Sequence, residues 1–306
     1  MQIDTSRLRH FVAVVDHGGF TAASKAVFVS QPALSLAVKE LERELGTPLF
    51  LRVGRGVRLT AAGAALLGPA RQALRDVETG RAAVAAVAGV VAGSLHVCSL
   101  PTLAAEPMAG LVGRFRRHHP RVRVDLAAPE DSRDLFNLVE SGTCELGLTD
   151  ALHVPESLES IDLGQQSLVF IHPPGTSRSK SGGGVAVAVT HATPFVAPPE
   201  GTSTRRLLDE QLGALEITPL LAVTSAQREA IIPLVLAGAG AALVPEALAR
   251  FAEQFGAVVS RPDPPADRRL ALVHRSGELS PAAARFCDLA GRSGTVGDLG
   301  IAKLDD

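Results

Sequence analysis

The stretch formed by residues 20–45 most strongly constrains what this chain can fold into. Its pattern predicts two short helices joined by a tight turn. Within the second helix, Leu34, Val38, Leu41 and Leu45 recur at helical spacing and therefore share one face. An apolar face of this kind packs into a hydrophobic core, so we expect the helix pair to belong to a small folded domain.

Another face of the second helix is polar. Gln31, Ser35 and Lys39 lie four residues apart along the chain and come together on that face. Their side chains are short or flexible, form hydrogen bonds and carry one positive charge. Such a surface suits the base edges and phosphates of a DNA major groove.

The ends of both helices carry matching signals. Thr21 and Ser30 are the expected N-caps of the first and second helix, because each hydroxyl can accept a bond from an otherwise unpaired backbone N–H group. Pro32 falls in the first turn of the second helix, where its missing N–H costs little. Gly46 is expected to end that helix.

The flanking segments extend this unit to a winged helix-turn-helix. An upstream helix is predicted by an apolar stripe of four residues, Leu8, Phe11, Val12 and Val15. Downstream, residues 48–60 predict a hairpin with Gly54 and Gly56 at its tip. Its cationic side chains, which could reach phosphates or a narrow minor groove, are Arg52, Arg55 and Arg58.

The stretch FTAASKAVFVSQPALSLAVKELERELGTPLFLRVGRGVRLTAAG resembles the N-terminal signature of the LysR-type transcriptional regulators, and the match is long and ungapped. The resemblance implies a mainly α winged helix-turn-helix, a long linker helix that dimerises, and an α/β two-lobed effector-binding domain similar to periplasmic binding proteins. The implied divisions are residues 1–60, 61–92 and 93–306. At Leu36 and Ala37 the chain departs from many family members, which have a basic or amide residue there.

Charge and hydropathy fit this assignment. The net charge is −2 at pH 7, but residues 1–60 hold eight Lys or Arg against five Asp or Glu and so carry +3. A modestly basic head on an acidic body suits local contact with phosphates. The sequence has no apolar run of membrane-spanning length and no pattern of a signal peptide, so we expect a cytoplasmic protein without a membrane partner.

From Thr60 to about Val91 the sequence predicts the linker helix. Two heptad series trace a narrow seam through it, one with Leu59, Leu66, Ala73, Gly80 and Val87, the other with Ala70, Val77, Val84 and Val91. The seam favours pairing with a second copy of the chain, to give a homodimer or homotetramer; the alternative is a helix packed on its own C-terminal domain. Pro69 is expected to kink or break the helix near Gly68.

From Gly93 the pattern alternates between strand and helix. Repeated β-α-β units imply parallel sheets. Strands are predicted over residues 95–100, 122–126, 145–149, 167–171, 195–198, 220–223, 241–245 and 269–274. Single helices are expected over 101–117, 131–141, after Thr202, over 226–237 and over 281–290, and residues 173–184 predict a loop. The resemblance implies a first lobe of about 93–163 plus 266–306 and a second of about 164–265.

Hydroxyl groups recur where predicted strands end and helices begin. Ligands bind beyond the carboxyl ends of parallel strands, and helix N-termini attract anions. We therefore hypothesise a cleft that holds a small carboxylate-bearing effector. Ser and Thr at such places are often only helix caps. The resemblance favours Ser99, Thr102, Thr202 and Ser203 as effector contacts, with further contacts expected from Ser132 and Thr149.

No catalytic or metal-binding constellation is visible in the sequence, and no cofactor is expected. The three cysteines, Cys98, Cys144 and Cys287, form no C-x-x-C pair; Cys98 and Cys144 fall on predicted buried strands. The expected partners are double-stranded DNA, a small effector and a second copy of the chain, with RNA polymerase as a further candidate. The alternative is a small-molecule-binding protein or enzyme that uses its N-terminal helices as an interaction module.

Overall fold

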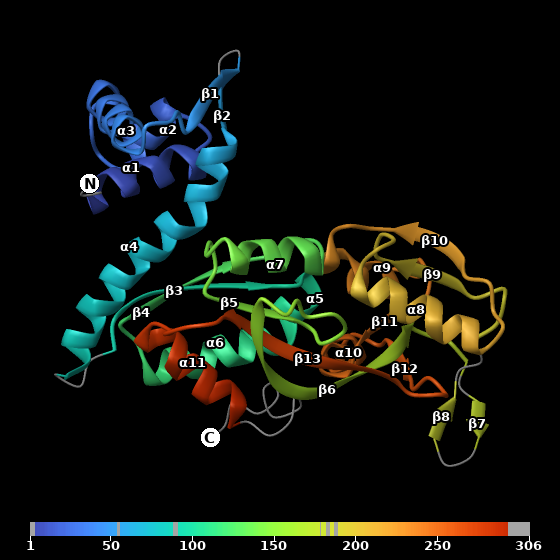
Figure 1. Cartoon of the computed structure of the whole chain (residues 1–306). Coiled ribbons are helices and arrows are strands. Elements are labelled where there is room, and N and C mark those ends of the chain that lie inside the picture. Colours follow the sequence, from blue (N-terminus) through green and yellow to red (C-terminus); the bar gives the residue numbers. More distant parts are fainter. Residues whose placement is uncertain are drawn as a thin grey trace.

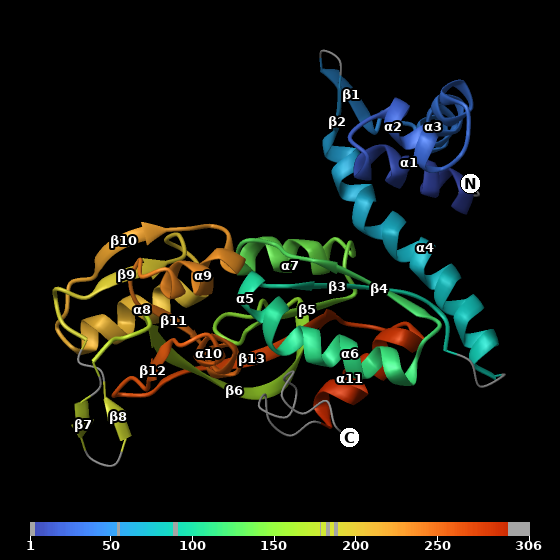
Figure 2. The same cartoon turned by 180° about the vertical axis from the view of Figure 1, so that it is seen from behind.

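The computed structural model describes residues 4–53, 56–87, 91–177, 179–181, 184–186 and 189–292. The chain forms a small N-terminal head, a long helix leading away from it, and a two-lobed α/β body (Figures 1 and 2). The head contains α1 (Thr5–Asp16), α2 (Phe20–Ala26), α3 (Gln31–Leu45) and the antiparallel hairpin of β1 (Phe50–Val53) and β2 (Gly56–Leu59). This is the winged helix-turn-helix that the sequence predicts.

The apolar stripe of α3 builds the core of the head. Leu34, Val38 and Leu41 are buried there, together with Phe11 of α1. The aromatic ring of Phe50, at the start of the wing, lies with its centroid 5.4 Å from that of Phe11. The buried side chains thus pack α3, which is the recognition helix of this motif, and the wing against the same core.

Both ends of α3 have the expected caps. The Ser30 hydroxyl accepts a bond from the Ala33 N–H at 3.3 Å, and Gly46 ends the helix with a left-handed φ of 70°, which glycine adopts without steric cost. The expectation for α2 was wrong. Its N-cap is Gly19, and Thr21 lies within the first turn, because the helix begins at Phe20, two residues earlier than the Thr21 cap requires.

A side chain of α3 also fixes the wing. Glu42 accepts backbone N–H bonds from Leu49 at 2.8 Å and from Phe50 at 3.2 Å. These two donors begin the hairpin, so one carboxylate sets the orientation of the wing relative to the recognition helix.

The long helix is α4 (Ala61–Val87). Thr60 precedes it, and the Thr60 hydroxyl accepts the Gly63 N–H at 2.9 Å. The helix continues through Pro69, so the break expected near Gly68 is absent. A proline removes one hydrogen bond of the ladder, and burial of Ala70 against the head supports the helix at this point. Residues 88–90, where the predicted helix would end, lie outside the described residues.

The heptad seam of α4 divides into two parts. Leu66, Ala70 and Ala73 pack against the apolar side of the chain's own head. Beyond them, Val77 and Val84 are exposed, Val84 by 76%. Leu66, Ala70 and Ala73 of the seam therefore complete the core of the head, whereas Val77 and Val84 face solvent.

The body is built on a seven-stranded sheet with the order β11-β6-β13-β5-β3-β4, in which β12 also pairs with β6. Its strands are β3 (Gly93–Ser99), β4 (Val122–Ala127), β5 (Leu146–Asp150), β6 (Leu158–His172), β11 (Ala242–Pro245), β12 (Val258–Ser260) and β13 (Ala266–Arg275). The expectation of parallel sheets holds for part of this sheet: β3 pairs in parallel with β4 and β5, whereas the pairs made by β6 and β13 are antiparallel, so the sheet is mixed.

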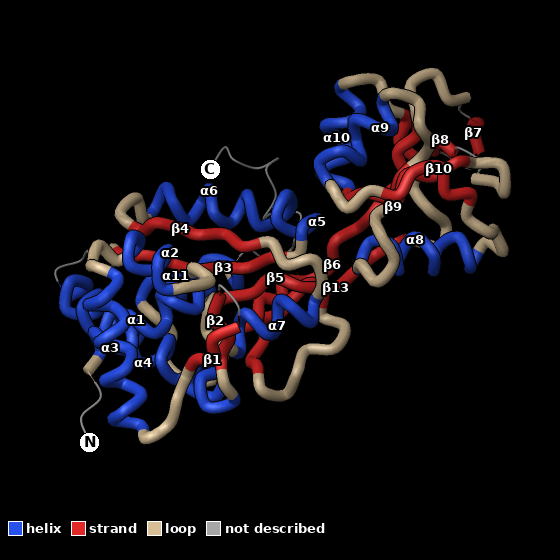
Figure 3. Tube along the Cα trace, turned by 90° about the horizontal axis from the view of Figure 1, so that it is seen from above, coloured by secondary structure: helices blue, strands red, loops and turns tan. Residues whose placement is uncertain are grey.

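Figure 3 shows β6 and β13 running from one lobe into the other. Lobe I gathers β3, β4 and β5 with α5 (Pro101–Leu103), a kinked segment (Ala104–Met108), α6 (Ala109–His118), α7 (Ser132–Glu140) and α11 (Pro281–Gly291). Lobe II gathers β11 and β12 with the parallel pair β9 (Pro194–Ala197) and β10 (Leu220–Thr224), α8 (Ser203–Ala214), a 3-10 turn (Arg228–Ala230), α9 (Ile231–Leu236) and α10 (Glu246–Gln254).

Several local expectations about the body need correction. The helix expected over 101–117 is interrupted at Glu106, whose φ of −156° and ψ of 119° are extended, as favoured for a residue before proline. The loop expected over 173–184 contains β7 (Ser179–Ser181), which pairs with β8 (Gly184–Ala186). Strand β6 begins nine residues before the predicted start, and α10 and β12 were not predicted.

One residue of the head has an unfavourable backbone conformation. Phe28, between α2 and α3, has a φ of 57° and is 95% exposed. A left-handed conformation costs a residue with a Cβ atom roughly 1–2 kcal/mol, and no packing offsets this cost here.

We predict that Phe28→Gly raises the free energy of unfolding by about 1 kcal/mol, because glycine removes the strain. Urea unfolding followed by circular dichroism measures it, since the chain has no Trp or Tyr. The matched control is Phe255→Gly, at an exposed phenylalanine with an ordinary φ of −101°. Equal destabilisation by both substitutions would contradict the assignment of strain.

Candidate functional sites: the recognition helix and the cavity between the lobes

The polar residues of α3 face away from the core of the head. Gln31 and Lys39 are exposed and Ser35 is half-buried. Pro32 is exposed in the first turn, and Ser30 caps the helix. The helix therefore presents hydrogen-bonding groups and one ammonium group on a surface that no other described element covers.

The helix before the turn supports this surface. Thr21 donates from its hydroxyl to the Gln31 Oε1 at 3.0 Å, which links the first turn of α2 to the first turn of α3. The wing adds Arg58, which is exposed. Arg55 lies outside the described residues, and for Arg52 only the backbone, in β1, is described.

A cavity of about 380 Å³ lies between the lobes. It is lined from lobe I by the start of α5, the start of α7 and the end of β5, and from lobe II by the start of α8. Four hydroxyl-bearing residues from the sequence prediction line it: Thr102, Ser132, Thr202 and Ser203.

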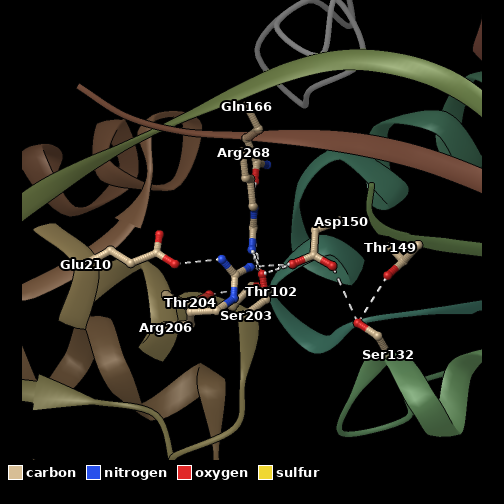
Figure 4. Close-up of polar contacts among 10 residues, drawn as sticks. All are labelled: Thr102, Ser132, Thr149, Asp150, Gln166, Ser203, Thr204, Arg206, Glu210 and Arg268. Carbon is tan, nitrogen blue, oxygen red and sulfur yellow. Dashed lines mark hydrogen bonds and ion pairs between the residues drawn. The ribbon is translucent and has the colours of Figure 1, made fainter. Parts of the chain in front are cut away.

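Asp150 joins the two sides of this cavity, as Figure 4 shows. This residue ends β5 in lobe I and is 6% exposed. Its Oδ2 accepts from the Ser203 hydroxyl at 2.7 Å and from Arg206 Nη2 at 2.9 Å, both on α8 of lobe II. Arg206 Nη1 also donates to Glu210 Oε1 at 3.1 Å. A carboxylate thus occupies the place where the hydroxyl of Ser203 and a guanidinium converge.

Arg268 forms the buried wall behind this contact (Figure 4). Its Nε donates to Gln166 Oε1 at 2.7 Å. Its Nη1 donates to Thr102 Oγ1 at 3.3 Å, in lobe I, and to Ser203 Oγ at 3.4 Å, in lobe II. Burial lowers the pKa of the guanidinium to about 10, although the charge of Asp150 acts in the opposite direction. Arg268 therefore stays cationic at neutral pH and directs positive charge toward the cavity.

The other residues predicted to contact the effector have less direct access to the cavity. Thr149 is fully buried and reaches the cavity only through Ser132, to whose Oγ it donates at 3.3 Å. Thr202 lines the cavity, but its hydroxyl donates to the Pro199 carbonyl at 2.8 Å. Ser99 is absent from the described cavity wall. It is enclosed in lobe I, where its hydroxyl donates to the Leu100 carbonyl at 3.2 Å, so its side chain does not form part of the cavity surface.

Sequence reasoning missed the charged groups that organise the cavity: Asp150, Arg206 and Arg268. Asp150 follows the predicted third strand by one residue, so its position at a strand's carboxyl end was a usable signal. Arg268 immediately precedes the strand predicted over 269–274 and carried no local signal, because its partners are at least 65 residues away in sequence.

Cys98, Cys144 and Cys287 are all buried, and none forms a disulfide. A hydrogen bond with Cys144 and burial both raise the pKa of the Cys98 thiol, and burial raises that of Cys287 to about 12. These two thiols are therefore protonated at neutral pH and pack as small apolar groups.

Within the described part of the chain, no group of three or more His, Cys, Asp or Glu side chains is placed to hold a metal ion. The same residues include no helix long and apolar enough to cross a bilayer.

Comparison with known proteins decides the family. Residues 5–64 match the family model of the bacterial regulatory helix-turn-helix proteins of the lysR family, and residues 88–294 match that of the LysR substrate binding domain. The chain belongs to the LysR family. It is a LysR-type transcriptional regulator with an effector-binding domain, and its curated relatives are transcriptional regulators rather than enzymes.

Two relatives span almost the whole chain. The HTH-type transcriptional regulator YnfL of Escherichia coli K12 is 30% identical over 295 residues, covering 94% of this chain and 97% of its own length. The HTH-type transcriptional regulator ClcR of Pseudomonas putida is 27% identical over 297 residues, covering 92% and 96%. These alignments include both the head and the two-lobed body of the LysR family.

Solved structures share the fold. Full-length OxyR from Pseudomonas aeruginosa has a TM-score of 0.71 at 20% identity and covers 97% of each chain. Full-length CbnR complexed with its target DNA has a TM-score of 0.64 at 22% identity, covering 95% of this chain and 99% of that one. Both agree with the winged head followed by a two-lobed α/β domain.

We predict that Asp150→Asn lowers the free energy of unfolding of the two-lobed domain by about 2 kcal/mol, because it weakens charge-assisted bonds at a buried site beside Arg268. Calorimetric unfolding measures the change. Asp162→Asn is the matched control, since Asp162 pairs with Arg269 at the surface, where an ion pair contributes less than about 1 kcal/mol. Equal effects would show that Asp150 is no more important than a surface carboxylate.

Proposed function

We propose that this LysR-type regulator binds a specific operator through α3 and the wing, and that a small carboxylate-bearing metabolite, bound between the lobes, controls that binding. The observation that carries the effector class is Arg268, a buried cation beside the cavity that is satisfied mainly by neutral groups. Such a cation favours an anionic ligand, since an additional negative partner offsets its desolvation.

The contacts of Asp150 support the same class of ligand. Its carboxylate already accepts from Ser203 and Arg206, at the N-terminal end of α8. Helix N-termini favour anions, and α7 begins at the same cavity with Ser132. We infer that the carboxylate of an effector replaces Asp150 at these donors, with further contacts from Thr102, Ser132 and Thr202, and that Thr149 acts through Ser132. Ser99 does not line the cavity and has no direct part in this proposal.

On the DNA side, we propose that Gln31, Ser35 and Lys39 contact base edges and phosphates in the major groove. Thr21, Ser30 and Pro32 lie at the helix ends around this surface and contact the phosphate backbone. The wing contributes three arginines toward phosphates or the minor groove, Arg52, Arg55 and Arg58.

For the organisation, we propose a winged head of residues 1–60, a linker of 61–92 and an effector domain of 93–306. Within the last, lobe I takes about 93–163 plus 266–306 and lobe II about 164–265. The exposed Val77 and Val84 of α4 support pairing with a second copy, as a homodimer or homotetramer that places two heads on a two-part operator. RNA polymerase is the proposed further partner of the DNA-bound protein.

A route from the cavity to the head is built into α4. Arg75 donates to the carbonyl of Gly142, and Arg71 donates both to Thr143 and to Asp16 at the end of α1. Gly142 and Thr143 form the turn between α7 and β5. Since α7 and β5 both reach the cavity at their other ends, a ligand that moves either one changes the support of the head.

We predict that Lys39→Ala weakens binding to DNA from upstream of this protein's own gene and lowers the slope of log K against log salt by about 0.9, because one phosphate contact is lost. Fluorescence anisotropy of labelled DNA at several salt concentrations measures this slope. Arg250→Ala removes one exposed cation from α10 in lobe II and should leave it unchanged. Equal slopes for Lys39→Ala and the wild type would rule out the phosphate contact.

For the effector, acetate, succinate, benzoate and citrate are tested first by thermal shift, then by calorimetric titration of those that stabilise the protein. We expect Ser203→Ala to weaken the bound carboxylate about tenfold, the effect of one lost charge-assisted hydrogen bond. Ser99→Ala, a buried serine away from the cavity, should bind as the wild type does. If Ser203→Ala also retains full affinity, the carboxylate is bound elsewhere.

A further inference from the structure

The recognition helix carries one large apolar side chain on its outer face. Leu36 is 59% exposed, and it packs in neither of the two apolar clusters of the head. At 3.6 residues per turn, it points almost directly away from the buried stripe of Leu34, Val38 and Leu41. Leu36 therefore sits near the middle of the surface that α3 presents outward.

The residues around Leu36 indicate what covers it. Pro32 lies one turn before it, and Lys39 and Arg43 lie one and two turns after it, all exposed on the same side. The two cations favour a polyanion as the partner of this face. An acidic duplex fits this charge pattern, and it brings an edge of each base pair to the helix surface.

We infer that Leu36 determines operator sequence by packing against the C5-methyl group of a thymine in the major groove. The thymine methyl is the one apolar feature among the base edges there, and leucine has no donor or acceptor for the others. A cytosine amino group or a purine edge placed against Leu36 would lose water without gaining a hydrogen bond. The inference rests on the proposed DNA binding by α3 and adds the kind of base that one residue selects.

The test begins with selection of bound sequences from a random duplex library by the full-length protein. Each thymine of the selected site is then replaced singly by deoxyuridine, which lacks only the methyl group. We expect one thymine in each half-site at which this replacement weakens binding about fourfold, the effect of one buried methyl group. In Leu36→Ala the same replacement should have no effect.

Two further variants sharpen the result. Leu215→Ala truncates another exposed leucine, after α8 in lobe II, and should keep the full sensitivity to deoxyuridine. Leu36→Gln introduces an amide that can pair with the N6 and N7 atoms of adenine, so selection with this variant should change the preferred base at that position from thymine to adenine.

The outcomes separate this inference from the proposed function. Sequence-preferring binding that is insensitive to deoxyuridine at every position, or equally sensitive in Leu36→Ala, overturns the role of Leu36 while leaving the regulator intact. A change of oligomeric state in Leu36→Ala with unchanged deoxyuridine sensitivity assigns the residue to a contact between copies and also overturns it. Failure to select any preferred sequence counts against DNA recognition by α3 itself.

Discussion

The antiparallel pairing of β6 with β13 is the constraint on which the rest of the body depends. These two strands pair from Leu158–Arg275 at one end to Leu168–Ala266 at the other, with one shift of register between Leu270 and Ala271, and they belong to both lobes. Two hydrogen-bonded strands bend and twist as a unit more readily than they separate, so the lobes can change their angle without losing the sheet. The register also places Arg268 directly opposite Gln166, whose amide oxygen accepts from the guanidinium. The position of the buried cation beside the cavity is thus fixed by backbone pairing.

Because of this register, segments that are far apart in the sequence come together at the cavity. Asp150 pairs with Leu270 in the register of β5 and β13, two residues along from Arg268. Its contacts with Ser203 and Arg206 then tie lobe I to the N-terminal end of α8. In this structure, the protein's own carboxylate therefore occupies the donors of lobe II. Under the proposed function, an effector's carboxylate competes with that of Asp150, which would couple effector binding to the arrangement of the lobes.

Local patterns in the sequence predicted the elements whose causes are local. The buried stripe of α3 and the caps at Ser30 and Gly46 depend on residues within a few positions of one another, and these predictions are confirmed. Thr21 is not the cap because the helix already begins at Phe20, with Gly19 as its N-cap. The first half of β6 and the position of Arg268 depend on pairing with strands about a hundred residues away, and nothing local signals such contacts. The sequence pointed to the hydroxyl-bearing residues of the cavity because Ser and Thr mark the starts of helices. It did not point to the charged residues that bond to these hydroxyls, Asp150 and Arg268.

Differences in binding free energy limit how strongly the proposed effector can change DNA binding by the head. A ligand shifts an equilibrium only by the difference between its affinities for the two states. Because Asp150 already satisfies Ser203 and Arg206, an effector's carboxylate gains only the difference between its own contacts and those it replaces. Coupling of about 1–3 kcal/mol, typical of allosteric proteins, is consistent with such an exchange. In the proposed route, Arg71 connects the two parts directly, since it is bonded to both Asp16 of the head and Thr143 of lobe I. By linkage, bound DNA must change the affinity for the effector by the same factor.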